Sequence, residues 1–164
     1  MSGQDFVREV YDASYRRLVV QLFALSGNQA EAEDVVQEAF VKAIGQAGRF
    51  GQLDNPEAWL RTVAINGLRN RWRRTSVLRR VTPRIPGVQQ RAELSPDHVD
   101  LVSALRRLPA ELREVVVLHH LADVPVAEVA RTLGVPEGTV KARLVRGRDQ
   151  LADALSDREE PKHV

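Results

Sequence analysis

The stretch VAEVARTLGVPEGTVKARL, residues 126–144, decides the fold of this chain. Apolar residues recur in it at helical spacing, first up to Leu133 and again from Val140 onward. The intervening Gly134-Val135-Pro136 carries the signals that end one helix and begin the next. The pattern therefore predicts two helices joined by a tight turn, the first over 126–133 and the second from 137 to about 155.

Three positions in this stretch meet the packing demands of a helix-turn-helix. Ala130 is small where the second helix crosses the first, and Gly134 tolerates a positive φ in the turn. Val140 is a β-branched residue of the second helix that packs against the first. In this motif the second helix enters the major groove of DNA. Because the outward side of the second helix carries long cations, the stretch predicts DNA binding. An ordinary helical hairpin with a solvated basic face is the alternative.

Gly147 interrupts the second of these helices. Glycine inside a helix costs about 1 kcal/mol relative to alanine. No feature of the sequence accounts for a glycine at this position.

The rest of the chain is also predicted to be helical. Further helices are expected at about 7–25, 31–47, 57–74, 96–108 and 109–121. Asn28 is a suitable N-cap for the helix over 31–47, whose apolar stripe includes Phe40 and Ile44. The helix over 57–74 is expected to bury Trp59 and to turn its arginines outward, Arg61 among them.

The helical period is lost between about residues 75 and 94, where Pro83, Pro86 and Gly87 break any helix. The sequence therefore predicts an all-α protein of two small helical domains joined by a flexible basic linker. The expected bounds are 1–75 and 95–156 for the domains, 76–94 for the linker and 157–164 for a charged tail.

Charge is unevenly distributed along the 164 residues, although the formal net charge is only +2. The stretch from Arg61 to Arg91 holds nine arginines and no acid. The acids Glu31, Glu33, Asp34 and Glu38, in contrast, lie within eight residues of one another. Such a chain can present one surface to a polyanion and another to a basic partner.

Several classes of function are not expected. The absence of cysteine excludes disulfides, thiolate zinc sites and thiol nucleophiles. No phosphate-binding loop, dinucleotide fingerprint or nucleophile elbow occurs. His119 and His120 are adjacent and should point away from each other on a helix, so no metal site is predicted. We therefore expect no enzyme activity and no cofactor.

No membrane insertion is expected either. The apolar runs fall well short of the roughly 18 residues that span a bilayer. The first residues, MSGQD, lack the basic start and apolar stretch of a signal peptide. A cytoplasmic location is the expectation that follows.

Several strings resemble one known family. LPAELREVVVL (108–118), AEVA (127–130) and GTVKARLVRGR (138–148) are similar to the C-terminal domain of extracytoplasmic-function RNA polymerase sigma factors. AEDVVQEAF (32–40) and PEAWLRTVA (56–64) resemble the segments with which that family binds polymerase and opens promoters. The match covers about residues 5–155 and implies a sigma2-like helical bundle followed by a sigma4-like helix-turn-helix, as in the sigma-70 family.

The resemblance implies partners and a docking surface. The partners are core RNA polymerase, through its β′ and β subunits, promoter DNA, and an anti-sigma factor that masks both modules. The residues implied in polymerase docking are Asp34, Gln37, Glu38 and Phe40. A solvated helix face is the alternative reading of these acids.

The resemblance also implies two DNA-reading sets. The residues implied in recognising the −10 element and in melting the DNA are Arg61, Asn66, Arg69, Asn70, Trp72, Arg73 and Arg74. Lys141, Ala142, Val145 and Arg146 match positions that read −35 bases, and Thr139, Arg143 and Arg148 match backbone contacts. Ala142 stands where the family frequently has serine, so the −35 sequence that this chain reads can differ.

The function implied is that of a sigma factor, which directs core polymerase to promoters while the polymerase performs the chemistry. Two alternatives stay open at this point. A conventional helix-turn-helix regulator would bind duplex operators without polymerase, usually as a dimer on symmetric half-sites. A metal-dependent nuclease would need a third metal ligand beside Asp34 and Glu38, and the sequence offers none.

Overall fold

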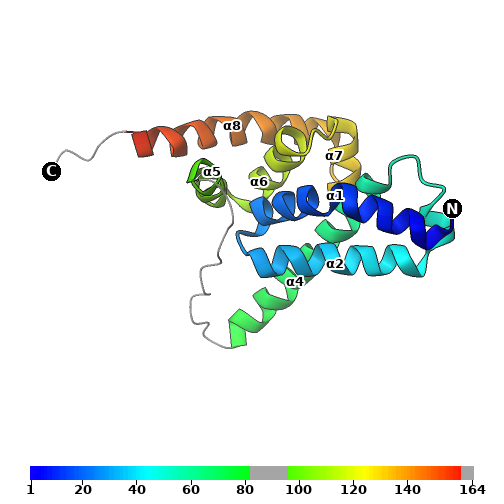
Figure 1. The fold of residues 1–164 in the computed structure, drawn as a ribbon. Coiled ribbons are helices and arrows are strands. Elements are labelled where there is room, and N and C mark those ends of the chain that lie inside the picture. Colours follow the sequence, from blue (N-terminus) through cyan, green and yellow to red (C-terminus); the bar gives the residue numbers. More distant parts are fainter. Residues whose placement is uncertain (82–95, 160–164) are drawn as a thin grey trace. The chain divides into compact units, whose positions relative to one another are not determined.

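The computed structural model describes residues 1–81 and 96–159, and every regular element in these two ranges is helical (Figure 1). The chain divides into two compact units, Met1–Arg91 and Ala92–Val164. The prediction of an all-α protein with two helical domains is confirmed. Of the predicted linker, 76–94, only residues 76–81 are described; the rest of this prediction lies outside the described residues.

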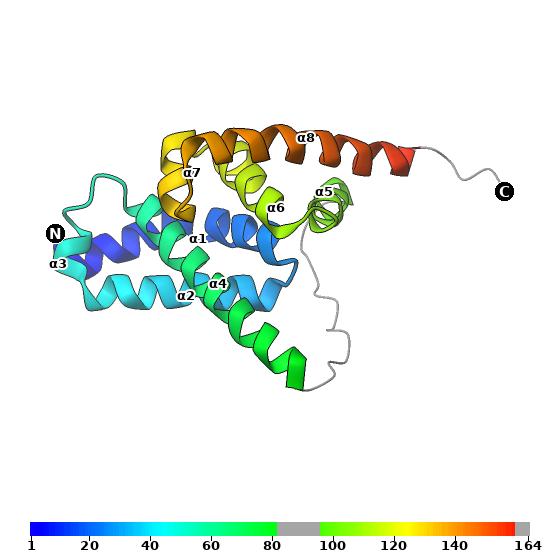
Figure 2. The same ribbon diagram turned by 180° about the vertical axis from the view of Figure 1, so that it is seen from behind.

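Helices of the first unit pack in a short bundle. Their bounds are α1 (Gly3–Ser26), α2 (Gln29–Gly45), α3 (Ala47–Phe50) and α4 (Pro56–Val81). α1 lies beside α2, and α4 crosses α2 (Figure 2). As predicted, Asn28 caps α2, because its Oδ1 accepts a hydrogen bond from the backbone N–H of Glu31 at 3.0 Å.

The core of the first unit is an apolar layer between α1, α2 and α4. Its buried side chains include Leu18, Leu22, Leu25, Val35, Val36, Leu60, Ile65 and Leu68. Phe50 closes one end of the layer, with its ring centroid 5.6 Å from that of Trp59. Trp59, which we expected to be buried, is half-buried and packs edge-on against Phe50. Ile44, which we expected to be buried, is 51% exposed because it lies at the edge of the apolar stripe of α2.

α4 continues to Val81, beyond Arg74, where we expected this helix to end. The expectation rested on the loss of the apolar period after Thr75. A helix without an apolar stripe can still continue when its residues favour helix. Leucine and arginine do so, and no glycine or proline occurs between Thr75 and Pro83.

The second unit contains the helix-turn-helix. Its bounds are α5 (Pro96–Arg106), α6 (Ala110–Val116), the π-helical turn η1 (Val117–Leu121), α7 (Val126–Leu133) and α8 (Glu137–Glu159). α8 packs on α5, α6 and α7. Gly134 has a φ of 69°, and Ala130 and Val140 are buried. All three positions therefore behave as the motif requires, and the predicted helix-turn-helix is confirmed.

His119 and His120 lie in the π-helical turn, and their rings approach each other. The ring centroids are 4.9 Å apart in an edge-to-face arrangement, so the expectation that the two side chains diverge is wrong. A π turn bonds residue i to i+5 and therefore rotates successive side chains less than an α-helix does. The Nδ1 of His119 also lies 2.8 Å from the carbonyl oxygen of Val124, which fixes its ring.

Gly147 allows α8 to approach α6 closely. A Cβ at this position would lie 2.7 Å from Cγ2 of Val116 and 3.5 Å from the carbonyl oxygen of Leu112. Val116 is buried and β-branched, so its methyl group has little freedom to move away. The packing of α8 on α6 thus supplies the reason for a glycine that the sequence leaves unexplained.

Gly147→Ala is expected to lower the free energy of unfolding by about 1–2 kcal/mol. The added methyl group overpacks the contact between α6 and α8, and this effect outweighs the gain of about 1 kcal/mol in helix propensity. Gly138→Ala is the matched control in α8, because no atom lies within 4 Å of its Cβ position. Urea unfolding followed by circular dichroism compares the two variants. A Gly147→Ala protein as stable as Gly138→Ala would contradict the proposed steric role.

Candidate functional site

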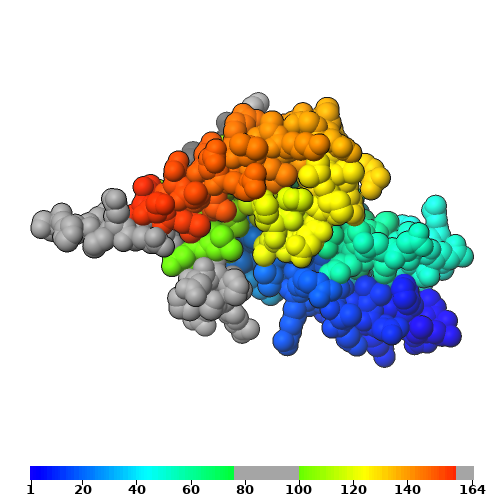
Figure 3. Space-filling view, turned by 90° about the horizontal axis from the view of Figure 1, so that it is seen from above, coloured from blue at the N-terminus to red at the C-terminus, as the bar shows by residue number. Residues whose placement is uncertain are grey.

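The outward side of α8 carries the predicted −35 residues. Val140 and Leu144 are buried, which turns the opposite side of the helix to solvent. The exposed side chains of the predicted set are Lys141, Ala142, Val145, Arg146 and Arg148. Figure 3 shows the surface of α8, in orange, open along the helix. Because long cations project from this exposed side, it suits phosphates and guanine edges.

Thr139 and Arg143, the remaining residues of the −35 set, are half-buried. The Nη2 of Arg143 lies 3.8 Å from Oε2 of Glu111 in α6. An ion pair of this length with one largely exposed partner, Glu111, is weak. A phosphate at the edge of α8 can therefore replace Glu111 as the partner of Arg143.

α4 carries most of the predicted −10 residues on one side. Asn66, Asn70, Arg73 and Arg74 are exposed, and Arg69 and Trp72 are half-buried. The i, i+3 and i+4 spacing aligns residues 66, 69, 70 and 73, while Trp72 lies nearer the core. Cations and amides beside a partly exposed indole can hold a phosphate backbone and stack an unpaired base.

Arg61 does not belong to this side of α4, so the expectation that it points outward is wrong. Its side chain is buried, and its Nε donates a hydrogen bond to Oε1 of Gln21 in α1 at 2.9 Å. Arg61 lies seven residues, or about two helical turns, before the buried Leu68. The helical period therefore turns Arg61 toward the core.

Arg61→Ala should consequently lower stability. The substitution removes a donor from the buried Oε1 of Gln21, which costs about 1–3 kcal/mol. Arg73→Ala removes an exposed arginine of the same helix and should leave the melting temperature unchanged. Thermal unfolding of the two variants checks this difference, and equal melting temperatures would contradict a buried role for Arg61.

The outward side of α2 combines acids with apolar side chains. Asp34, Gln37 and Glu38 are exposed, as a docking surface requires. Val41 and Ile44 lie one to two turns further along the same side and are 67% and 51% exposed. We did not predict this apolar extension, because a valine or isoleucine in an amphipathic helix is normally assigned to the buried stripe.

Phe40 requires a correction, since its side chain is only 4% exposed and cannot contact a partner directly. Its ring packs edge-on against Tyr11, with centroids 4.9 Å apart. Tyr11 in turn stacks on Tyr15. Phe40 therefore packs between α2 and α1 and supports α2 from its buried side.

Residues far away in sequence contact the acids of α2. Arg71 of α4 forms ion pairs with Asp34 and Glu38. The hydroxyl of Tyr15 in α1 accepts a long hydrogen bond of 3.4 Å from Nε2 of Gln37. Sequence reasoning missed both Arg71 and Tyr15, because a spacing of 22 to 37 residues between two helices carries no periodic signal.

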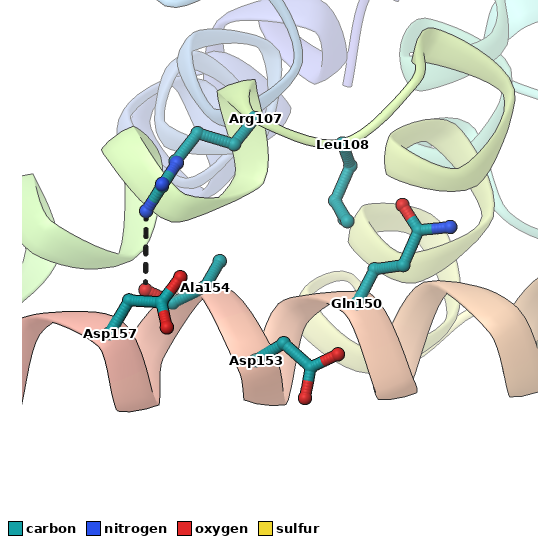
Figure 4. A pocket seen from close by; sticks show the side chains of 6 residues that line it. All are labelled: Arg107, Leu108, Gln150, Asp153, Ala154 and Asp157. Atoms are coloured by element: carbon teal, nitrogen blue, oxygen red, sulfur yellow. Dashed lines mark hydrogen bonds between the residues drawn. The ribbon is translucent and has the colours of Figure 1, made fainter.

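A groove in the second unit is lined by Arg107, Leu108, Gln150, Asp153, Ala154 and Asp157 (Figure 4). Its volume is about 210 Å³, which is below the roughly 300–1,000 Å³ of small-molecule sites. In residues 1–81 and 96–159, no three His, Asp or Glu side chains gather as a metal site would need. No helix in the same ranges is long and apolar enough to cross a membrane.

Two family models match the chain, one in each unit. They are Sigma-70 region 2 over residues 10–77 and Sigma-70, region 4 over residues 98–151. ECF RNA polymerase sigma factor SigM of Mycobacterium tuberculosis is 34% identical, over 90% of this chain and 78% of that protein. ECF RNA polymerase sigma factor SigE of Mycolicibacterium smegmatis is 35% identical over 94% of this chain, which spans only 62% of that relative.

Solved structures agree with these sequence matches. The sigma factor RpoE from Bartonella quintana, in complex with the anti-sigma factor NepR, has a TM-score of 0.77 and 26% identity. That match covers 93% of this chain and 98% of RpoE. The extracytoplasmic function sigma factor SigJ of Mycobacterium tuberculosis has a TM-score of 0.60 and 26% identity, over 88% of this chain and 53% of SigJ.

The fold and the two matched regions define a two-module helical protein in which the second module carries a DNA-binding motif. Each module corresponds to one region of the sigma-70 architecture. The chain belongs to the extracytoplasmic-function RNA polymerase sigma factors of the sigma-70 family. A conventional helix-turn-helix regulator is not favoured, since it leaves the match over residues 10–77 unexplained.

Proposed function

We propose that this sigma factor binds core RNA polymerase through α2, reads the −35 element with α8, and reads and helps to melt the −10 element with α4. The polymerase performs the chemistry, in the cytoplasm, and this chain contributes no catalytic group. The observation that carries the proposal is the presence of two outward-facing basic helices and one acidic helix face in a family that initiates transcription.

The proposed polymerase contact is supported by the composition of the α2 face. One end of this face carries the polar side chains of Asp34, Gln37 and Glu38. The exposed apolar side chains of Val41 and Ile44 extend the face along the helix. Protein interfaces commonly combine an apolar centre with a polar rim. A negative rim also favours approach of a basic surface and rejects an acidic one.

The proposed division of the promoter between α8 and α4 is supported by their different side chains. α8 is a regular helix behind a tight turn, which suits the major groove of a duplex. α4 adds asparagines and Trp72 to its arginines, which suits bases that have left the stack. We therefore assign the duplex −35 element to α8 and the melted −10 element to α4.

We also propose that an anti-sigma factor controls this protein. Support comes from the structurally similar sigma factor RpoE, which was solved in complex with the anti-sigma factor NepR. The partner should bind this chain tightly and block its association with core polymerase. Failure of a candidate partner to block that association would exclude it.

Reconstituted transcription tests the proposed function. Core RNA polymerase with this chain should initiate at specific promoters, and core enzyme alone should not. Without polymerase, the chain should bind promoter DNA only weakly and in a salt-sensitive way, as measured by gel shift. Tight binding to a symmetric operator without polymerase, combined with no effect on initiation, would overturn the proposal.

Two substitutions should separate the proposed functions. Arg146→Ala should relax the −35 preference and cost on the order of 1–3 kcal/mol if the arginine makes a bidentate base contact. Glu38→Lys should weaken polymerase binding and leave −35 recognition unaffected. Polymerase affinity and transcription from −35 variants measure the two effects, and an unchanged polymerase affinity for Glu38→Lys would exclude the α2 face as the docking surface.

A further inference from the structure

The side chain of Arg71 in α4 turns toward α2. Its Nη2 lies 2.5 Å from Oε1 of Glu38, and its Nη1 lies 3.5 Å from Oδ2 of Asp34, so one guanidinium spans both carboxylates. The Arg71 side chain is 31% exposed, whereas those of Asp34 and Glu38 are 61% and 58% exposed. Arg71 is therefore more enclosed than the two acids, which remain accessible to a partner.

The close approach of α4 to α2 makes this contact possible. A Cβ at Gly67, one turn before Arg71, would lie 3.7 Å from Cγ1 of Val35 and 4.0 Å from Oε2 of Glu38. The Glu38 side chain therefore reaches the surface of α4 near Gly67, where Arg71 meets it. The packing of the two helices fixes the distance that the ion pairs span.

Stability does not explain this cluster by itself, since ion pairs as exposed as these contribute little to folding. Asp34 and Glu38 are like charges at i, i+4 spacing and repel each other. One arginine between them relieves the repulsion and leaves the three groups with a net negative charge. The ion pairs restrain the two carboxylates, and the cluster can still attract a basic surface.

We propose that Arg71 is a positioning residue for polymerase docking, which holds the carboxylates of Glu38 and Asp34 in the conformation that core RNA polymerase binds. This inference rests on the proposed function, in which the α2 face is the docking surface. Ordering a flexible side chain at an interface costs free energy, and a side chain already ordered in the free protein avoids that cost. Arg71 thus serves polymerase binding, although it lies on the helix that we assign to the −10 element.

Binding of full-length variants to core RNA polymerase, measured by fluorescence anisotropy, tests this role. Arg71→Ala should weaken binding about 3- to 10-fold. Arg71→Lys keeps the charge but loses the planar, two-pronged geometry, so its affinity should lie between those of Arg71→Ala and wild type. Arg8→Ala is the matched control, because it removes an exposed arginine of α1 and should bind as wild type does.

A double-mutant cycle distinguishes positioning from a direct contact. In a chain that carries Asp34→Asn and Glu38→Gln, Arg71→Ala should change polymerase affinity by less than about 2-fold. An undiminished loss in that background would overturn the proposal, because Arg71 would then act without the acids. Arg71→Ala binding as tightly as wild type, or more tightly, would overturn it as well.

Controls keep these outcomes distinct. Thermal unfolding of each variant checks the fold; if Arg71→Ala does not fold, Arg71→Lys decides, and wild-type affinity in that variant overturns the proposal. A wild-type chain that fails to bind core polymerase would overturn both the proposed function and this inference. Wild-type binding with an unaffected Arg71→Ala would overturn the inference alone.

Discussion

The burial of a single apolar stripe on each helix is the constraint on which both units depend. In α8, Val140 and Leu144 fill this stripe and leave Lys141 and Arg146 on the outside. The same division in α2 leaves its acids on the side away from the core. Since the outer side of such a helix has few packing demands, it can carry charge for recognition with little effect on stability. The surfaces that we propose for binding are therefore the sides of helices that do not pack in the core.

In α4, different sides of one helix pack in the core, contact α2 and face solvent. Leu60 and Leu68 bury one side of it, Arg71 reaches the acids of α2, and Asn70 and Arg73 are turned to solvent. A regular helix transmits displacement along its length, because its backbone hydrogen bonds hold successive turns together. The surface that we assign to polymerase and the surface that we assign to the −10 element are thus connected through one rigid element.

Sequence reasoning failed mainly at the edges of apolar stripes and at helix ends. Arg61 carries a long charged side chain and was expected outside, yet its position in the helical period turns it to Gln21. Ile44 was expected inside, yet it lies at the edge of the apolar stripe of α2 and is half exposed. At the edge of an apolar stripe, the residue type and its place in the helical period can predict opposite exposures for the side chain. Only the packing of the neighbouring helix decides whether such a side chain is buried or exposed.

The sequence by itself determined the features that depend on local order: the helices, the N-cap at Asn28, the turn at Gly134 and the helix-turn-helix. These follow from interactions within a few residues of the chain. The tertiary structure alone decided why position 147 lacks a side chain and which cation meets Glu38. Periodicity tells which side of a helix a residue occupies. The residue opposite, and its distance, depend on how whole helices fill the space between them.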